Sequence, residues 1–168
     1  MPNPVVEVVT NHGSFAIELD PAKAPKSVEN FLRYVDAKHY DGTVFHRVIP
    51  TFMIQGGGFD VELEKRPVSA AIQNEATNGV KNTRGTVAMA RTNEPHSATA
   101  QFFVNVTDNA FLDHTAKSGS GWGYTVFGEV TSGMEVAEKM VAMPTGPAGP
   151  FAKDAPQKPI VIKSARRK

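Results

Sequence analysis

The feature that most limits the fold of this chain is a long succession of short strand-like segments, interrupted by only two helical patterns. Residues 5–9 are rich in β-branched valine, and Phe15, Ile17 and Leu19 recur at every second position beyond the turn Asn11-His12-Gly13. Asparagine and glycine tolerate the positive φ angles of tight turns, so the first 20 residues are predicted to form a β-hairpin. Further strand-like segments are residues 44–49, 52–55, 86–90, 102–106, 124–130 and 160–163.

Two segments carry helical spacing instead. After Pro25, apolar side chains recur every three or four residues from Val28 to Val35. Ser132 and Glu135 match a capping box that opens a second helix, which the proline and glycine residues from Pro144 onward end. Turn clusters, such as residues 56–58 (GGG), separate the strands. This pattern predicts a mainly β fold, a closed or nearly closed antiparallel β-barrel whose openings are covered by two α-helices.

Length and charge narrow the class of protein. A chain of 168 residues suits a single domain over residues 1–168. The net charge of +1 does not favour nucleic-acid binding, and the absence of cysteine excludes disulfides and thiolate chemistry. No apolar segment approaches the roughly 18 residues of a membrane span. The N-terminus, Met1-Pro2-Asn3-Pro4, carries no signal-peptide pattern. We therefore expect a cytoplasmic monomer with no membrane or nucleic-acid partner.

The sequence also allows a prediction for the C-terminus and for one long connection. The basic C-terminus, Arg166-Arg167-Lys168, is expected to be solvated, as short charged termini usually are. Residues 60–73 form a long connection with little pattern, and such connections in compact domains are often functional.

The common catalytic constellations have little support. The five histidines lack the close spacing of metal ligands. The glycines of residues 56–58 are not followed by the lysine and hydroxyl residue of a phosphate-binding loop, and no nucleophile-elbow pattern is present. No metal site and no cofactor are expected.

Residues 45–57 carry a different signal. In a regular strand, Arg47 shares a face with Phe45 and Ile49, which places a permanent cation on an apolar surface. The side chain could also simply extend to the rim of the sheet, as long cationic side chains often do.

Two neighbouring strands show the same mixture of polar and large apolar side chains. Met53 and Gln55 share one face, and Gln101, Phe103 and Asn105 share another. Ligand pockets are lined in this way, mostly apolar with a few directed donors. Ordinary core packing explains any single face, but the three together favour a pocket.

At these residues the chain resembles the cyclophilins, the peptidyl-prolyl cis-trans isomerases that assist protein folding. Residues 45–57 (FHRVIPTFMIQGG) look like the signature of that family, and residues 89–90, 100–103 (AQFF) and 127–130 (FGEV) follow in its order. Residues 74–76 (NEA), 82–86 (NTRGT) and 111–114 (FLDH) are similar to the bacterial cytoplasmic type. The resemblance covers about residues 5–161 and implies an eight-stranded antiparallel barrel closed by two helices.

The resemblance also implies a role for each matching residue and names proline-containing polypeptides as partners. It assigns catalysis to Arg47, Gln55 and Phe52, where Gln55 orients the arginine and contacts the substrate backbone, and Phe52 belongs to the apolar proline pocket. The residues that it assigns to substrate binding are Met53, Ala90, Arg91, Thr92, Gln101, Phe103, Phe111, Leu112 and Tyr124.

Three positions depart from many eukaryotic cyclophilins. Phe111 stands in place of tryptophan, Tyr124 in place of histidine, and Arg91 in place of asparagine. The first change removes an indole N–H, so binding of the inhibitor cyclosporin is expected to be weaker than in those relatives. Trp122 does not align with the missing tryptophan. Arg91 is expected to change little, because the backbone makes the contact there.

Three functional hypotheses follow. The first is an active isomerase, and the second is a non-catalytic chaperone or adaptor that holds proline segments in the same groove. The third is a barrel that binds a small apolar ligand. Arg47 favours the first, because simple holding needs no donor at the twisting amide.

Overall fold

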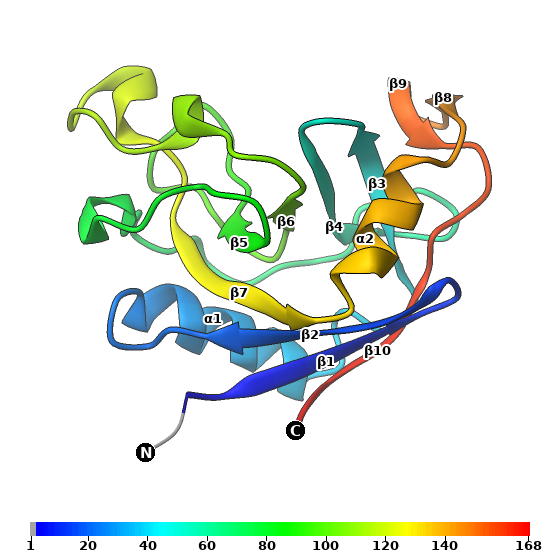
Figure 1. The fold of residues 1–168 in the computed structure, drawn as a ribbon, viewed down its shortest axis with the longest axis horizontal. Coiled ribbons are helices and arrows are strands. Elements are labelled where there is room, and N and C mark those ends of the chain that lie inside the picture. Colours follow the sequence, from blue (N-terminus) through cyan, green and yellow to red (C-terminus); the bar gives the residue numbers. More distant parts are fainter. Residues whose placement is uncertain (1–2) are drawn as a thin grey trace.

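Eight antiparallel strands form one strongly curved sheet, with two helices packed against it (Figure 1). The structure, a computed structural model, describes residues 3–168. Met1 and Pro2, which open the segment on which the cytoplasmic expectation rests, lie outside the described residues. The strands of the sheet are β1 (Val5–Thr10), β2 (Gly13–Leu19), β3 (Thr43–Ile49), β4 (Met53–Asp60), β5 (Thr86–Met89), β6 (Phe102–Asn105), β7 (Val126–Ser132) and β10 (Ile162–Arg167).

The remaining elements are two helices, three single turns of 3-10 helix and a small hairpin. The strand order in the sheet is β10-β1-β2-β7-β5-β6-β4-β3. The other elements are α1 (Pro25–Asp36), α2 (Met134–Val141), η1 (Ala76–Asn78), η2 (Ala110–Leu112), η3 (Gly119–Trp122), β8 (Thr145–Ala148) and β9 (Phe151–Pro156). The hairpin of β8 and β9 was not predicted, because its prolines and glycines are typical of a loop.

The two edge strands of the sheet, β10 and β3, approach each other and nearly close the barrel. Val44 and Val161 form an isolated antiparallel bridge. The backbone N–H of Phe45 donates to the Ile160 carbonyl at 3.0 Å, and that of Gly42 donates to the Ile162 carbonyl at 2.8 Å. The predicted fold, a nearly closed antiparallel barrel of eight strands with two helices, is confirmed.

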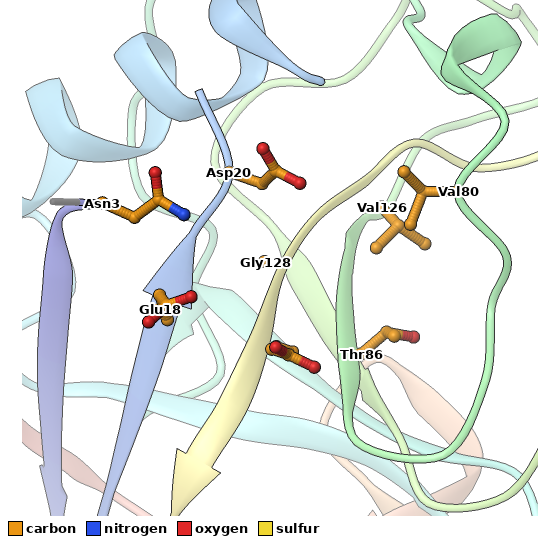
Figure 2. Close-up of a pocket in the computed structure, with 8 residues that line it drawn as sticks. Asn3, Glu18, Asp20, Val80, Thr86, Val126 and Gly128 are labelled. Atoms are coloured by element: carbon orange, nitrogen blue, oxygen red, sulfur yellow. The ribbon is translucent and has the colours of Figure 1, made fainter. Parts of the chain in front are cut away.

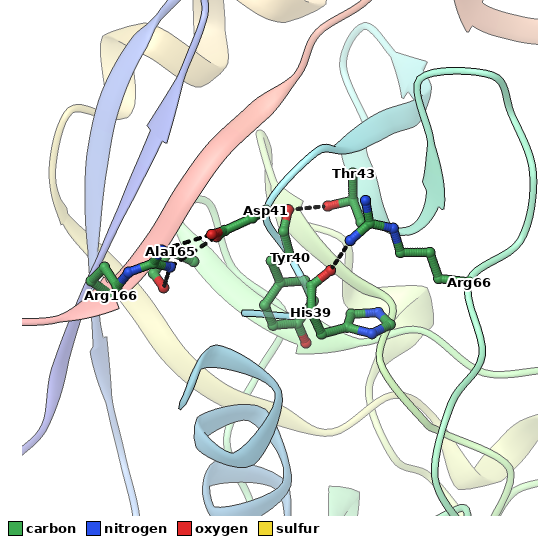
Figure 3. A network of polar contacts seen from close by, with 7 residues as sticks. All are labelled: His39, Tyr40, Asp41, Thr43, Arg66, Ala165 and Arg166. Atoms are coloured by element: carbon green, nitrogen blue, oxygen red, sulfur yellow. Dashed lines mark hydrogen bonds and ion pairs between the residues drawn. The ribbon is translucent and has the colours of Figure 1, made fainter. Parts of the chain in front are cut away.

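Side-chain contacts support the structure around this closure (Figure 3). Arg166 of β10 binds both carboxylate oxygens of Asp41, at 2.7 and 2.8 Å, and this lowers the pKa of Asp41. Thr43 Oγ1 donates to the Tyr40 carbonyl at 2.6 Å. Arg167 pairs in the same way with Asp36 of α1. Arg166 and Arg167 are exposed, as expected of a solvated C-terminus, but they also belong to a strand and pair with carboxylates.

The helices fill the main core. From α1, Phe31 packs against the rings of Tyr40, Phe102 and Phe127 with centroids 5.1–5.5 Å apart. From α2, the side chain of Met140 is fully buried in the same cluster. Within residues 3–168, no helix is both long and apolar enough to span a membrane.

The predicted capping box of α2 does not form. Its N-cap is Gly133, at φ +84°, and no side chain caps the helix. A Cβ at Gly133 would collide with the backbone of Ser14 and Phe15 in β2. Close packing of the helix start against β2 therefore selects glycine there.

Residues 56–58 lie inside β4, so their interpretation as a turn is wrong. A Cβ at Gly58 would lie 2.5–2.6 Å from side-chain atoms of Gln101, and one at Gly57 would lie 2.7 Å from the Tyr40 ring. Glycine in a strand often marks such a close approach. The absence of a side chain at Gly58 leaves the space that the Gln101 side chain occupies.

A β-bulge in β3 separates Phe45 from Arg47. Phe45 lies opposite Gly56, and Arg47 lies opposite Gln55, so two steps along β3 match one step along β4. The extra residue, His46, turns the strand, as bulges do. Phe45 is completely buried in the main core, whereas Arg47 is exposed. The predicted common face of Arg47 and Phe45 is therefore wrong.

The bulge buries His46 and generates a pH dependence of stability. His46 is 5% exposed, and burial, with a smaller effect of Arg47, lowers its pKa from 6.5 to about 4. The unfolded chain therefore binds more protons between these values, and stability falls as the pH falls. We expect the free energy of unfolding to drop by about 2 kcal/mol more between pH 7 and pH 5 in the wild type than in His46→Phe.

Urea denaturation at the two pH values measures this difference. Burial also lowers the pKa of His39, but His39 is present in both proteins, so the comparison isolates His46. Equal losses of stability in the two proteins would contradict the account.

Candidate active site

Nine of the predicted site residues line one cavity of about 120 Å³. The strands β3, β4 and β6 supply one wall, and the segments after β5, in η2 and before β7 supply the other. Thr92, Gln101 and Phe111 lie outside this lining. The lining residues are Arg47, Phe52, Met53, Gln55, Ala90, Arg91, Phe103, Leu112 and Tyr124.

The cavity has an apolar floor. Met53, Phe103 and Leu112 are buried and form, with Ala88, Ala90 and Val126, a cluster separate from the main core. The Phe103 ring meets the Tyr124 ring edge-on, with centroids 5.7 Å apart. A floor of this kind suits a small apolar ring and excludes water from it.

Arg47 brings a cation to this apolar surface. Arg47 Nη1 donates to Gln55 Oε1 at 3.5 Å, and Gln55 Nε2 donates to Gln101 Oε1 at 3.0 Å. The guanidinium carbon lies 5.9 Å from the centre of the Phe52 ring. Among the described residues, no carboxylate pairs with Arg47, so its charge is available to a ligand. Gln101 lies outside the cavity lining, and it therefore acts on Arg47 through Gln55.

A second guanidinium lines the cavity, that of Arg91. It lies 4.5 Å from the centre of the Tyr124 ring, and its Nε donates to the Gly123 carbonyl at 3.0 Å. Its Nη1 donates to the Thr92 carbonyl at 2.8 Å. The Thr92 side chain itself is exposed and bonds Ser97. The side chain of Arg91 therefore shapes this wall, in addition to the backbone contact that the resemblance implies.

Phe111 lies at the rim. It is 72% exposed, and its ring packs against Phe52 with centroids 5.5 Å apart. Trp122 packs instead between His96 and His114, at 4.8 and 5.6 Å between ring centroids.

The comparisons with known proteins agree with this geometry. The chain is 56% identical over 161 residues to the peptidyl-prolyl cis-trans isomerase cyp18 of Streptomyces antibioticus, covering 96% of each chain. It is 52% identical to peptidyl-prolyl cis-trans isomerase B of Escherichia coli, covering 92% of this chain and 94% of that one. Residues 5–167 match the model of the cyclophilin type peptidyl-prolyl cis-trans isomerase family. The chain is a cyclophilin.

A solved structure extends the likeness to three dimensions. The cyclophilin type isomerase of Cryptosporidium parvum, crystallised in the presence of the dipeptide Ala-Pro, matches with a TM-score of 0.78 and 25% identity, covering 98% of each chain. The family expected from the sequence, its isomerase activity and the likeness to bacterial members are confirmed. The cyclophilin is a peptidyl-prolyl cis-trans isomerase.

Three buried asparagines lie behind the cavity; none was predicted as a catalytic or substrate-binding residue, although Asn105 was placed on a pocket-like face. Asn105 Nδ2 donates to Asn82 Oδ1 at 3.1 Å and to Thr86 Oγ1 at 2.9 Å. Asn109 Nδ2 donates to Asn105 Oδ1 at 2.8 Å. All three amides are at most 2% exposed, so each depends on its partners for hydrogen bonding. The sequence signals for this network are residues 82–86, part of the bacterial resemblance, and the face that Asn105 shares with Gln101 and Phe103.

The asparagine network holds backbone atoms of three cavity residues. Asn82 Nδ2 donates to the carbonyl oxygens of Leu112 at 3.2 Å and Tyr124 at 3.3 Å. Asn109 Nδ2 donates to the Phe52 carbonyl at 3.0 Å. The cyclophilin thus fixes segments from opposite sides of the cavity through one chain of amides.

A second cavity of the cyclophilin, about 180 Å³, offers different chemistry (Figure 2). Glu18, Asp20 and Glu129 line it, and Val80 and Val126 lie next to each other on one side. It has no cation in its lining, and no cluster suited to a metal ion occurs within residues 3–168. The lining of this second cavity therefore offers no cationic donor like the one that Arg47 brings to the first cavity.

Removal of an amide from the network should impair catalysis beyond its effect on stability. We expect Asn105→Ala to lower kcat/KM for an Xaa-Pro peptide by about tenfold, since displaced walls misalign the substrate. The matched control is Asn30→Ala in α1, which removes an equally buried amide that donates to the Thr99 carbonyl. Each variant should lose about 1–3 kcal/mol of unfolding free energy. Equal isomerase rates in the two variants would show a purely structural role.

Proposed function

We propose that this cyclophilin accelerates rotation about Xaa-Pro bonds by seating the proline ring in the apolar cavity and donating from Arg47 to the twisted amide. The observation that carries the proposal is the position of Arg47. Its guanidinium lines the same 120 Å³ cavity as Met53, Phe103 and Leu112, without a carboxylate partner among the described residues. No covalent intermediate is required.

The reaction defines what such a site must do. Amide resonance gives the peptide bond a rotation barrier of roughly 18–20 kcal/mol. At the barrier the nitrogen becomes pyramidal and the resonance is lost, so a donor that favours this form lowers the barrier. The guanidinium is planar, permanently charged and rich in donors, which suits this role. An apolar floor strengthens its effect, because water does not screen the interaction.

The other residues position the substrate and the arginine. Gln55, bonded to both Arg47 and Gln101, orients the guanidinium and contacts the substrate backbone. Phe52 flanks the arginine. The segment from Ala90 to Thr92 binds the residue before proline through its backbone. The Cryptosporidium parvum relative was crystallised in the presence of the dipeptide Ala-Pro, which supports proline-containing polypeptides as partners.

Two alternative functions were considered. A non-catalytic chaperone or adaptor would need the apolar floor but no donor at the amide. A barrel that binds some small apolar ligand would need neither Arg47 nor the pair Gln55 and Gln101. The chain of hydrogen bonds that holds Arg47 at the cavity supports catalysis over both.

Several sequence predictions accompany the proposal and remain to be tested. We predict one domain over residues 1–168, supported by a single sheet that includes strands from Val5 to Arg167. A role in assisting protein folding, a monomeric state and a cytoplasmic location also stay predictions. Size-exclusion chromatography and cell fractionation would test the last two.

Removal of the donor is expected to abolish most of the activity. Arg47→Ala should slow cis-to-trans relaxation of an Xaa-Pro peptide on the order of 10²-fold or more, as loss of one preorganised donor does. Arg84→Ala, which removes an exposed arginine paired with Glu138, is the matched control and should retain full activity. A folded Arg47→Ala protein with the rate of the wild type would refute the role given to Arg47.

Phe111 should weaken cyclosporin binding relative to cyclophilins with tryptophan at this position. It is exposed at the rim and offers no N–H to the inhibitor. We expect Phe111→Trp to tighten binding by about fivefold, the value of one added hydrogen bond. Isothermal titration calorimetry of both proteins measures the change. A nanomolar dissociation constant for the wild type would contradict the prediction.

A further inference from the structure

The cavity around Arg47 has a second cation in its lining, Arg91, on the opposite wall. The other lining residues that the structure describes are uncharged, so this cavity carries two positive charges and no negative one. The proposed function uses the side chain of Arg47 at the twisting amide. It uses only the backbone of the segment that contains Arg91, and the second guanidinium is therefore left without a role.

The Arg91 guanidinium is held in place by its surroundings. Its carbon atom lies 4.5 Å from the centre of the Tyr124 ring, and its Nε and Nη1 donate to the carbonyl oxygens of Gly123 and Thr92. The Gly123 carbonyl is itself fixed, because Nδ2 of the buried Asn74 donates to it at 3.1 Å. A donor that packing and hydrogen bonds already orient loses little conformational freedom when it binds a ligand.

Most of the binding capacity of Arg91 remains available to a ligand. A guanidinium has five N–H groups, and described residues accept hydrogen bonds from only two of its nitrogens. Both acceptors are uncharged carbonyl oxygens, so they leave the positive charge without a counter-ion. The ion pairs among the described residues involve Arg84, Arg166 and Arg167 instead. The group that matches a guanidinium in charge and geometry is a carboxylate, which it binds with two parallel hydrogen bonds.

We propose that Arg91 is a specificity-determining residue of this isomerase, which favours substrates with an acidic side chain directly before the proline. The inference rests on the proposed function, in which the segment from Ala90 to Thr92 binds the residue before proline. In that arrangement the side chain of this substrate residue lies next to the Arg91 guanidinium, whereas Arg47 faces the amide. An acidic side chain gains a charge-assisted hydrogen bond there, and a lysine meets a like charge.

Peptides that differ only in the residue before proline test the proposal. We expect kcat/KM for a Glu-Pro peptide to exceed that for the Gln-Pro peptide by about fivefold, and a Lys-Pro peptide to fall below it by a similar factor. In about 1 M NaCl the screening length shrinks to roughly 3 Å, so the preference for glutamate should fall below about twofold. Equal values for glutamate and glutamine at low salt would overturn the proposal.

A second pair of peptides tests the position of the preference. These peptides carry glutamate or glutamine directly after the proline, with alanine before it. We expect kcat/KM to differ by less than about twofold between them, because a side chain there lies farther from Arg91 and is screened by solvent. A preference for glutamate after proline that equals the one before it would contradict recognition by the segment from Ala90 to Thr92.

Variants of Arg91 assign the preference to its side chain. Arg91→Gln should bring the ratio of the glutamate and glutamine peptides to about one, and Arg91→Lys, which keeps the charge, should retain a ratio above about twofold. Arg84→Gln removes an equal charge outside the cavity lining and should keep the ratio of the wild type. A preference that persists in Arg91→Gln would assign it to Arg47 and overturn the proposal. Should Arg91→Gln not fold, the salt dependence and the two peptide pairs on the wild type decide the question.

The two proposals for this cavity fail in different ways. Arg47→Ala tests the proposed function through the rate that is common to all peptides. The Arg91 variants test the present inference through the ratio between peptides, which a general loss of activity does not change. A wild type that isomerises all peptides equally well therefore refutes the role of Arg91 and leaves that of Arg47 intact.

Discussion

The β-bulge at His46 is the constraint on which the rest of the structure depends. It sends Phe45 into the main core and Arg47 outward in only two steps along β3. A regular strand would place both side chains on one face and force either a cation into the core or a phenylalanine into solvent. The bulge resolves this conflict at the cost of burying an imidazole. The catalytic cation and the buried histidine are therefore two consequences of one local distortion.

Two sets of hydrogen bonds turn this exposed arginine into part of a defined cavity. From one side, Gln101 and Gln55 form a chain that ends at the guanidinium, and the glycine at position 58 makes room for it. From the other side, the buried amides centred on Asn105 hold the backbone of the opposite walls. Catalysis by differential binding requires such rigidity, because a mobile donor would stabilise the planar and twisted amides alike.

The sequence was sufficient for the fold class and for most of the cavity, and its failures have physical causes. Alternating strands and two amphipathic helices predict the barrel, and the resemblance to the cyclophilins assigns a role to every residue of the lining. The alternation of side chains in a regular strand predicted the wrong face for Phe45. The β-bulge depends on how β3 pairs with β4, and the local sequence of β3 does not contain that information. Glycines of residues 56–58 were interpreted as a turn, because their reason is contact with distant side chains. The asparagine network was missed as a unit, because its hydrogen bonds join Asn82, Asn105 and Asn109 across segments that are distant in the sequence.

The claim that Arg47 acts on the twisted amide is tested most directly by separating binding from turnover. Arg47→Lys keeps the charge but lacks the planar set of donors. Exchange spectroscopy of an Ala-Pro peptide at saturating protein gives the rate of cis-trans exchange in the bound state, and a titration gives its affinity. The account predicts that exchange slows by about tenfold or more, while the dissociation constant stays within about twofold. Unchanged exchange, or a loss confined to affinity, would contradict it.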